Sequence, residues 1–318
     1  MSTAAGCRVC GGRLARGLRV REMMFGTREQ FGYHQCAECG CLQIDEIPAD
    51  IGRHYPEQYY SYDSRRQSRA TRLRRGARRR WILAAPRPVV ALIGLLSRSD
   101  ELFHVYRKLG VKPGSRLLDV GAGSGKHVRE LRDAGVDALG VDPYLREDVS
   151  FEGRLLVRKA ELREMTGKFD FISFHHSLEH MPAQAEVLAQ ARRLLAAGGR
   201  ILVRVPTVTS EAFDLYQENW VNLDAPRHFY LHSHRSLEIV AAKAGLKLER
   251  LWCDSLGMQF MGSEQYRMDI PLMDPRSAAV AKGATLFSAA QREEYENRSR
   301  TLNRAMRGDA LCAVMRAA

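Results

Sequence analysis

Four cysteines near the N-terminus have the spacing of metal ligands. Cys7 and Cys10 are separated by two residues, as are Cys36 and Cys39, and glycine follows each pair. Such glycines allow the tight turn that points two thiolates at one ion. Four thiolates match tetrahedral Zn²⁺, and four protein ligands leave no open position for a substrate. The pattern therefore predicts a structural Zn²⁺ site that folds an N-terminal module, a zinc ribbon.

A glycine-rich loop and a later carboxylate could together bind an adenosine-containing ligand. Gly121, Gly123 and Gly125 follow a short apolar stretch, and Asp142 ends the next one. Glycines let a ligand approach the main chain closely, and an acid at that point can accept hydrogen bonds from both ribose hydroxyls. A nicotinamide-dependent enzyme would carry a third glycine at position 126, where Lys126 stands.

The order G-x-G-x-G, preceded by Asp119, resembles motif I of the class I S-adenosylmethionine-dependent methyltransferases. The resemblance covers about residues 101–255. Further matching segments are residues 160–161, 170–172, 178–180 and 194–203.

This resemblance implies that S-adenosylmethionine is the cofactor and methyl donor. Asp119 would face the methionine amino end, and the three loop glycines would give backbone approach. Asp142 would hold the ribose, and Glu161 would lie near the adenine edge. Because the donor's methyl group is already electrophilic, the protein must mainly align a nucleophile and remove a proton.

Six of the ten histidines fall between residues 175 and 234, and some of them could serve the acceptor. One hypothesis makes His180 or His228 a general base. A second makes His176, Glu179, His180 and His228 a site for a second divalent metal. Their spacing resembles the metal site of small-RNA ribose methyltransferases, although three imidazoles suit Zn²⁺ or Mn²⁺ better than Mg²⁺. A third interpretation is structural, with residues 179–180 orienting the helix that follows.

Residues 173–180 indicate what kind of atom is methylated. Enzymes that methylate exocyclic amines of bases usually carry an Asn/Asp-Pro-Pro-aromatic loop at this place, and no Pro-Pro pair stands here. Residues 54–60 and 223–229 resemble bacterial methyltransferases of sugar and polysaccharide biosynthesis. We therefore expect transfer to a hydroxyl, or a carbon, of a nucleotide-linked or lipid-linked sugar. The alternatives are an RNA methyltransferase and a non-catalytic zinc-ribbon protein that binds nucleic acid.

The elements that must position these residues are strands alternating with helices from about residue 101 onward. This order predicts an α/β, Rossmann-like, doubly wound sheet. We expect four parts: residues 1–62, the zinc ribbon and an aromatic connector; 63–100, an Arg-rich linker with an amphipathic helix; 101–262, the S-adenosylmethionine-binding domain; and 263–318, a helical C-terminal extension.

The positive charge is concentrated in the first third of the chain. Residues 1–100 hold 18 basic and 9 acidic residues, a net of +9 out of +12 for the whole chain. The segment Arg65–Arg80 could be a solvated linker helix, an anchor to an anionic membrane surface or, third, a contact to nucleic acid. The start of the chain carries no signal-peptide pattern. We therefore expect a cytoplasmic protein, peripheral on the inner face of the membrane if the basic segment binds lipid.

Overall fold

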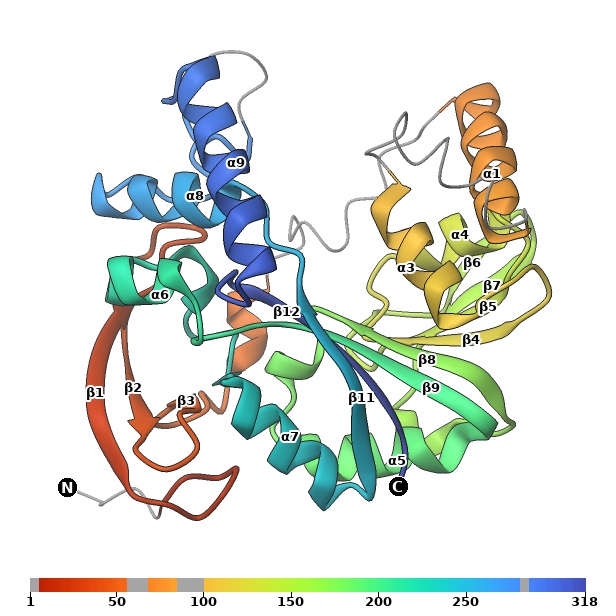
Figure 1. Ribbon diagram of the computed structural model, residues 1–318, viewed down its shortest axis with the longest axis horizontal. Helices are drawn as coiled ribbons and strands as arrows, with labels where there is room; N and C mark the ends of the chain where they lie inside the picture. The colour runs from red at the N-terminus through yellow and green to blue at the C-terminus, as the bar shows by residue number, and fades with distance from the viewer. Residues whose placement is uncertain (1–5, 56–67, 85–99, 281–285) are drawn as a thin grey trace.

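An eight-stranded sheet forms the centre of the molecule (Figure 1). The structure is a computed structural model, and it describes residues 6–55, 68–84, 100–280 and 286–318. The strand order is β11-β12-β9-β8-β4-β5-β7-β6, in which neighbours among β9, β8, β4, β5 and β7 are parallel. The strands are β4 (Arg116–Val120), β5 (Asp137–Val141), β6 (Val149–Phe151), β7 (Arg154–Arg158), β8 (Phe169–His175), β9 (Leu195–Pro206), β11 (Leu246–Cys253) and β12 (Ala310–Ala317).

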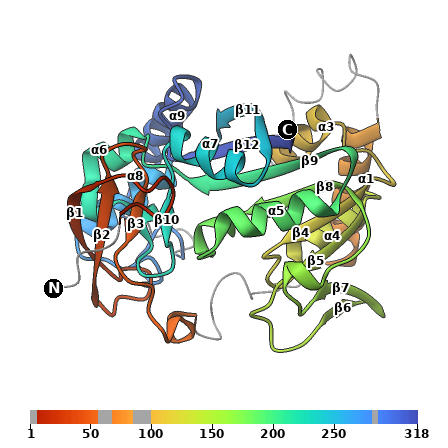
Figure 2. The same ribbon diagram turned by 90° about the horizontal axis from the view of Figure 1, so that it is seen from below.

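Helices cover both faces of this sheet, as Figures 1 and 2 show. Alternate residues of a strand point to opposite faces, so Leu117 of β4 joins one hydrophobic core and Leu118 the other. The first core includes α1 (Arg69–Ala84), α3 (Glu101–Leu109) and α4 (Lys126–Asp133); the second includes α5 (Gln184–Leu194) and α7 (His234–Lys243). The predicted doubly wound α/β fold is therefore confirmed.

A second, four-stranded sheet contains the N-terminal module. Its order is β1-β2-β3-β10, with β1 (Leu14–Arg21), β2 (Gln30–Cys36) and β3 (Leu42–Ile44) followed by β10 (Tyr230–Leu231) from much later in the chain. Because β10 pairs with β3, the module shares backbone hydrogen bonds with the rest of the molecule. Around it lie α6 (Glu211–Tyr216), α8 (Met258–Arg267) and α9 (Ala289–Arg304), on the same side in both views (Figures 1 and 2).

The expectation of a purely helical C-terminal extension is wrong for its last part. Residues 289–304 do form α9, but residues 310–317 form β12, which lies between β9 and β11 and is antiparallel to both. Alanine, leucine and methionine give this segment a helical propensity. Burial on both faces of the sheet decides instead, because residues 311–315 are at most 1% exposed.

The basic segment is helical where the structure describes it. Residues 56–67 and 85–99 lie outside the described residues, and with them most of the predicted aromatic connector and the first part of the Arg-rich segment. In α1, Arg72 pairs with Glu152 at 2.8 Å, and Arg79 pairs with Asp100 at 2.8 Å. These arginines therefore attach α1 to the domain. Among the described residues, no helix combines the length and the hydropathy needed to span a bilayer.

Candidate active site

The glycine-rich loop turns directly from β4 into α4. Gly121 has φ +75° and Gly125 has φ +73°, a left-handed conformation that side chains disfavour. A Cβ at Gly121 would lie 2.5 Å from Cβ of Ser177, and one at Gly125 would lie 2.6 Å from Cγ2 of Val157. Only glycine fits these two positions, because neighbouring side chains already occupy the space that a Cβ would need.

Asp142 stands at the end of β5 and is hydrogen-bonded to that loop. Its Oδ2 accepts a hydrogen bond from the Gly123 amide at 2.9 Å, and its Oδ1 accepts one from the Tyr144 amide at 2.9 Å. Burial raises the pKa of Asp142, and these two amide donors act in the opposite direction. Since a carboxylate oxygen can accept two hydrogen bonds, each oxygen retains capacity for a ligand hydroxyl.

One cavity of about 1200 Å³ contains both the loop and part of the histidine cluster. Gly121, Gly123 and Asp142 line it, as do His176 and His180. Its wall also includes stacked aromatic rings, because Tyr55 and Tyr144 lie 6.5 Å apart between centroids at an interplanar angle of 9°. The volume suffices for a cofactor together with an acceptor.

Glu161 and Asp119 are placed differently relative to this cavity. Glu161 lines it from the N-terminal end of a short 3-10 helix and pairs with Arg163 at 2.9 Å. Asp119 lies behind the loop, where its Oδ1 accepts a hydrogen bond from Ser173 at 2.7 Å. Burial raises the pKa of Asp119 to about 7, although the Ser173 hydroxyl lowers it. Because Asp119 does not line the cavity, we expect it to affect a bound ligand through the electric charge of its carboxylate.

The backbone fixes the tautomers of His180 and His228. Nδ1 of His180 lies 2.8 Å from the Arg227 carbonyl oxygen, and Nδ1 of His228 lies 2.8 Å from that of Asn222. A carbonyl only accepts, so in each neutral ring Nδ1 carries the hydrogen and Nε2 has a lone pair. Burial, followed by the neighbouring His228, lowers the pKa of His180 to about 4. His180 is therefore neutral at neutral pH.

Glu179 is fully buried between these rings. Its Oε1 lies 3.4 Å from Nδ1 of His176 and 3.9 Å from Nε2 of His228. Burial raises the pKa of Glu179, but His176, His180 and His228 outweigh it and lower the pKa overall. The four residues predicted as a base or metal site thus come together from two places: residues 176–180 after β8, and His228 before β10.

Contacts between distant parts of the chain hold this cluster in place. Arg227, fully buried, donates to Glu22 of the N-terminal module at 2.8 Å and to Asp224 at 2.7 Å. The Tyr33 hydroxyl donates to the His228 carbonyl oxygen at 2.8 Å. Glu22 lies 205 residues from Arg227, and Tyr33 lies 195 residues from His228, so no local spacing could have indicated these two contacts.

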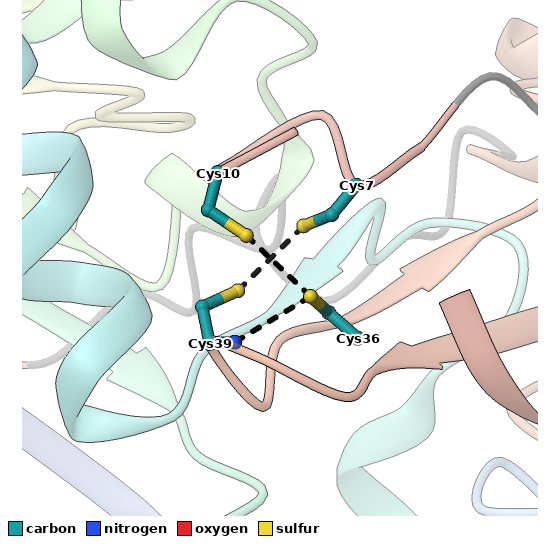
Figure 3. A group of neighbouring side chains, drawn as sticks. All are labelled: Cys7, Cys10, Cys36 and Cys39. Carbon is teal, nitrogen blue, oxygen red and sulfur yellow. Dashed lines mark hydrogen bonds between the residues drawn. The ribbon is translucent and has the colours of Figure 1, made fainter. Parts of the chain in front are cut away.

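The four cysteines converge as their spacing predicts (Figure 3). The Sγ atoms of Cys7 and Cys39 are 3.6 Å apart, and those of Cys10 and Cys36 are 3.5 Å apart. A hydrogen bond from Cys39 lowers the pKa of the Cys7 thiol to about 5. Four sulfurs all within 4.8 Å of one another are compatible with tetrahedral Zn²⁺. The nearby Cys41 thiol instead points to the Leu42 carbonyl oxygen at 3.7 Å.

Comparison with known proteins identifies the part of the chain that carries the cavity. Residues 96–251 match the family profile described as a methyltransferase domain. These residues are similar to a methyltransferase domain. The match supports the predicted enzyme class, a methyltransferase that uses S-adenosylmethionine.

Curated relatives of this methyltransferase domain act on different molecules. Phosphoethanolamine N-methyltransferase 2 of Caenorhabditis elegans is 22% identical over 159 residues, 46% of this chain and 36% of that protein. The ubiquinone biosynthesis O-methyltransferase of Methylococcus capsulatus is 33% identical over 99 residues, 28% of this chain and 42% of that protein. The chain thus spans less than half the length of these relatives.

Solved structures similar to the chain are also methyltransferases. An S-adenosylmethionine-dependent methyltransferase from Archaeoglobus fulgidus is 20% identical, with a TM-score of 0.41, over 71% of this chain and 97% of that one. The magnesium protoporphyrin IX methyltransferase of Synechocystis is 15% identical, with a TM-score of 0.38, over 65% of this chain and 89% of that one.

Proposed function

We propose that the protein transfers a methyl group from S-adenosylmethionine to a hydroxyl, or a carbon, of a sugar or glycan. The single observation that carries this proposal is the cavity of about 1200 Å³. It has the glycine loop and Asp142 in one part and the His180 imidazole in another. The candidate donor site and a candidate proton acceptor therefore line the same cavity.

The residues around the loop fit S-adenosylmethionine. Gly121 and Gly123 line the cavity without side chains, so a ligand can approach the main chain of the loop closely there. Asp142 has acceptor capacity for ribose hydroxyls, and Glu161 lines the same cavity. When bound, the cofactor supplies an electrophilic methyl group on a positively charged sulfur. The chain must hold it, orient the acceptor and remove the acceptor's proton.

The wall around His180 supports an oxygen or carbon acceptor. Its Nε2 lone pair can take the proton that a hydroxyl loses, since Nδ1 is committed to the Arg227 carbonyl oxygen. Aromatic rings and polar groups side by side, as at Tyr55, suit a sugar, which has both apolar faces and hydroxyls. Tyr55 and Arg227 belong to the two segments whose sequence resembles sugar methyltransferases.

Zinc at the four cysteines belongs to the same proposal, and its methyl donor and its sugar acceptor can be tested separately. Calorimetric titration with S-adenosylhomocysteine should show one site, and Asp142→Asn should weaken binding about tenfold or more. Incubation with methyl-labelled S-adenosylmethionine and a panel of sugar nucleotides, lipid-linked glycans and RNA should label a sugar. Label on RNA alone would favour an RNA methyltransferase. No S-adenosylhomocysteine binding at millimolar ligand would favour the non-catalytic binding protein.

A further inference from the structure

The Glu179 carboxylate is buried beside imidazole rings but accepts no hydrogen bond from the described residues. It is 0% exposed, and neither of its oxygens has a hydrogen-bond partner among the residues that the structure describes. Transferring a carboxylate out of water costs several kcal/mol in proteins unless a cation or hydrogen bonds compensate it. A ligand of positive charge is therefore expected beside Glu179.

The rings of His180 and His228 each offer a nitrogen lone pair close to the Glu179 carboxylate. The Nδ1 hydrogens of His180 and His228 are bound to carbonyl oxygens, which leaves both Nε2 atoms free to coordinate. This is the arrangement of metal-ligating histidines, whose second ring nitrogen usually donates to a carbonyl or carboxylate. One ligand atom from each of Glu179, His180 and His228 lies within 4.8 Å of the others. Ligands about 2.1 Å from one ion lie roughly 3.0–4.3 Å apart, so small side-chain movements suffice.

A second cluster shows what a group of this kind looks like when its centre is filled. Asp119, His127 and His175 also lie close together. There, however, the Tyr106 hydroxyl lies between the two rings, 2.7 Å from Nε2 of His127 and 2.6 Å from Nε2 of His175. The Tyr106 hydroxyl therefore accounts for the facing Nε2 atoms of that cluster, although Nδ1 of His175 has no hydrogen-bond partner among the described residues. Both oxygens of Glu179, by contrast, lack any such partner.

We propose that Glu179, His180 and His228, with His176 as a fourth ligand, bind one first-row divalent metal ion at the cavity wall. Three imidazoles and one carboxylate favour ions such as Zn²⁺, Mn²⁺ or Fe²⁺ over Mg²⁺. His176 lies 3.4 Å from Glu179 and lines the cavity, so the ion would be reachable by an acceptor.

The catalytic role of this ion rests on the proposed function. In that role the ion would promote loss of the acceptor's proton to water, and His180 would bind the ion and would not accept the proton. An acceptor hydroxyl bound to the ion has a lower pKa, so its O–H bond breaks and the proton passes to water. The oxygen's electron pair then forms the bond to the methyl carbon while the carbon–sulfur bond breaks. The sulfur keeps that electron pair and leaves as a neutral thioether.

The test uses Co²⁺ as a spectroscopic probe on the full chain with zinc already at the four cysteines. We expect a saturable d–d absorption without thiolate-to-cobalt charge transfer, because the second site holds nitrogen and oxygen only. Glu179→Gln should weaken Co²⁺ binding at least about a hundredfold, above the range seen for second-shell changes. Glu186→Gln is the matched control, because Glu186 is an exposed carboxylate lining the same cavity. It should bind Co²⁺ as the wild type does.

Two further measurements keep the outcome clear. If Glu179→Gln does not fold, His176→Asn decides, since the His176 side chain is 40% exposed and Asn tolerates its positive φ. We expect at least about tenfold weaker Co²⁺ binding in that variant. No saturable signal in the wild type, or equal binding in the wild type and a folded ligand variant, would overturn the inference. Titration with S-adenosylhomocysteine reports separately on the methyl-donor site, so the two proposals can fail independently.

Discussion

At the scale of single residues, we expect Asp119 to link the protonation of the protein to cofactor binding. Burial raises the pKa of its carboxyl to about 7, with Asp142 acting in the same direction and Ser173 against it. His127 and His175 also lie close by, and burial lowers the pKa of both rings, so they are neutral. Near pH 7 the carboxyl is therefore about half protonated.

The prediction is that S-adenosylmethionine binds more tightly as pH rises from 6 to 8. The cofactor carries positive charge, which favours the Asp119 carboxylate, so binding releases protons below the pKa of the free protein. The affinity should change by up to about tenfold per pH unit below that pKa and level off above it. Calorimetry in two buffers of different ionisation enthalpy measures the released protons. Asp119→Asn should flatten the profile, and proton release unchanged by that substitution would contradict the assignment.

The residues that could be predicted from the sequence are those whose chemistry depends on local spacing. Gly121, Gly125 and Asp142 follow two strands that end at the same edge of a parallel sheet, so their order in the chain predicts their proximity. Tyr106 could not be found in this way, because it reaches His127 and His175 only after α3 has packed on the sheet.

At the scale of elements, the N-terminal sheet holds the segment that carries His228. Glu22 follows β1, and its Oε1 accepts hydrogen bonds from the Phe25 amide and from Arg227, while its Oε2 accepts one from the Thr27 amide. Both the turn after β1 and the position of Arg227 thus depend on one buried carboxylate.

We predict that Glu22→Gln lowers the free energy of unfolding by about 3 kcal/mol, because it leaves a buried guanidinium without one of its two carboxylates. Glu29→Gln is the control, since Glu29 pairs with Arg53 on the surface, where both side chains are at least 42% exposed. That change should cost less than about 1 kcal/mol. Urea unfolding monitored by fluorescence compares the two. Equal losses would show that the buried triad of Glu22, Arg227 and Asp224 is not a special contributor.

The same scale explains why β12 was expected to be a helix. Its sequence has no strict alternation of apolar and polar residues, because a strand inside the sheet is buried on both faces. Local propensity therefore favoured a helix, and only the gap between β9 and β11, closed by residues from the end of the chain, selects a strand. By contrast, turn residues or a helix follow β4 and β8, so the ends of these two strands could be predicted from the sequence.

At the scale of the whole molecule, the arginines of α1 fall into two groups, those paired with acidic residues of the domain and those exposed to solvent. Arg72 and Arg79 are paired with acids of the domain, but Arg74, Arg75 and Arg80 on α1 are exposed, next to a Leu73 that is 58% exposed. We propose that these exposed side chains contact anionic lipid, which would bring the protein to a lipid-linked acceptor.

The corresponding prediction is that the protein floats with vesicles containing phosphatidylglycerol but not with neutral vesicles. Replacing the three exposed arginines by glutamine should reduce flotation about tenfold or more, because each basic residue near the surface contributes about 1 kcal/mol. Replacing three basic residues away from α1, such as Arg235, Lys247 and Arg250, is the control. Equal flotation of both variants, or binding to RNA alone, would contradict the lipid proposal.

The four-cysteine cluster should stabilise the whole molecule rather than the N-terminal module alone. The Ser233 hydroxyl at the start of α7 donates to the Cys39 carbonyl oxygen at 2.5 Å, and Lys243 at the end of α7 donates to the Val9 carbonyl oxygen at 2.6 Å. These two hydrogen bonds attach both cysteine pairs to α7, a helix that packs against the eight-stranded sheet, and the pairing of β3 with β10 adds a further connection.

We therefore predict that Cys36→Ser lowers the temperature of one cooperative unfolding transition of the entire chain. Loss of one of four thiolate ligands should remove several kcal/mol of metal-linked folding free energy, out of the roughly 10–16 kcal/mol typical of structural zinc. Cys41→Ala is the control, because Cys41 is buried beside the cluster without joining it and should cost roughly 1 kcal/mol. Differential scanning calorimetry distinguishes the cases. A separate early transition in Cys36→Ser, with the main transition unmoved, would mean that the module unfolds alone, and His228 would then keep its position without it.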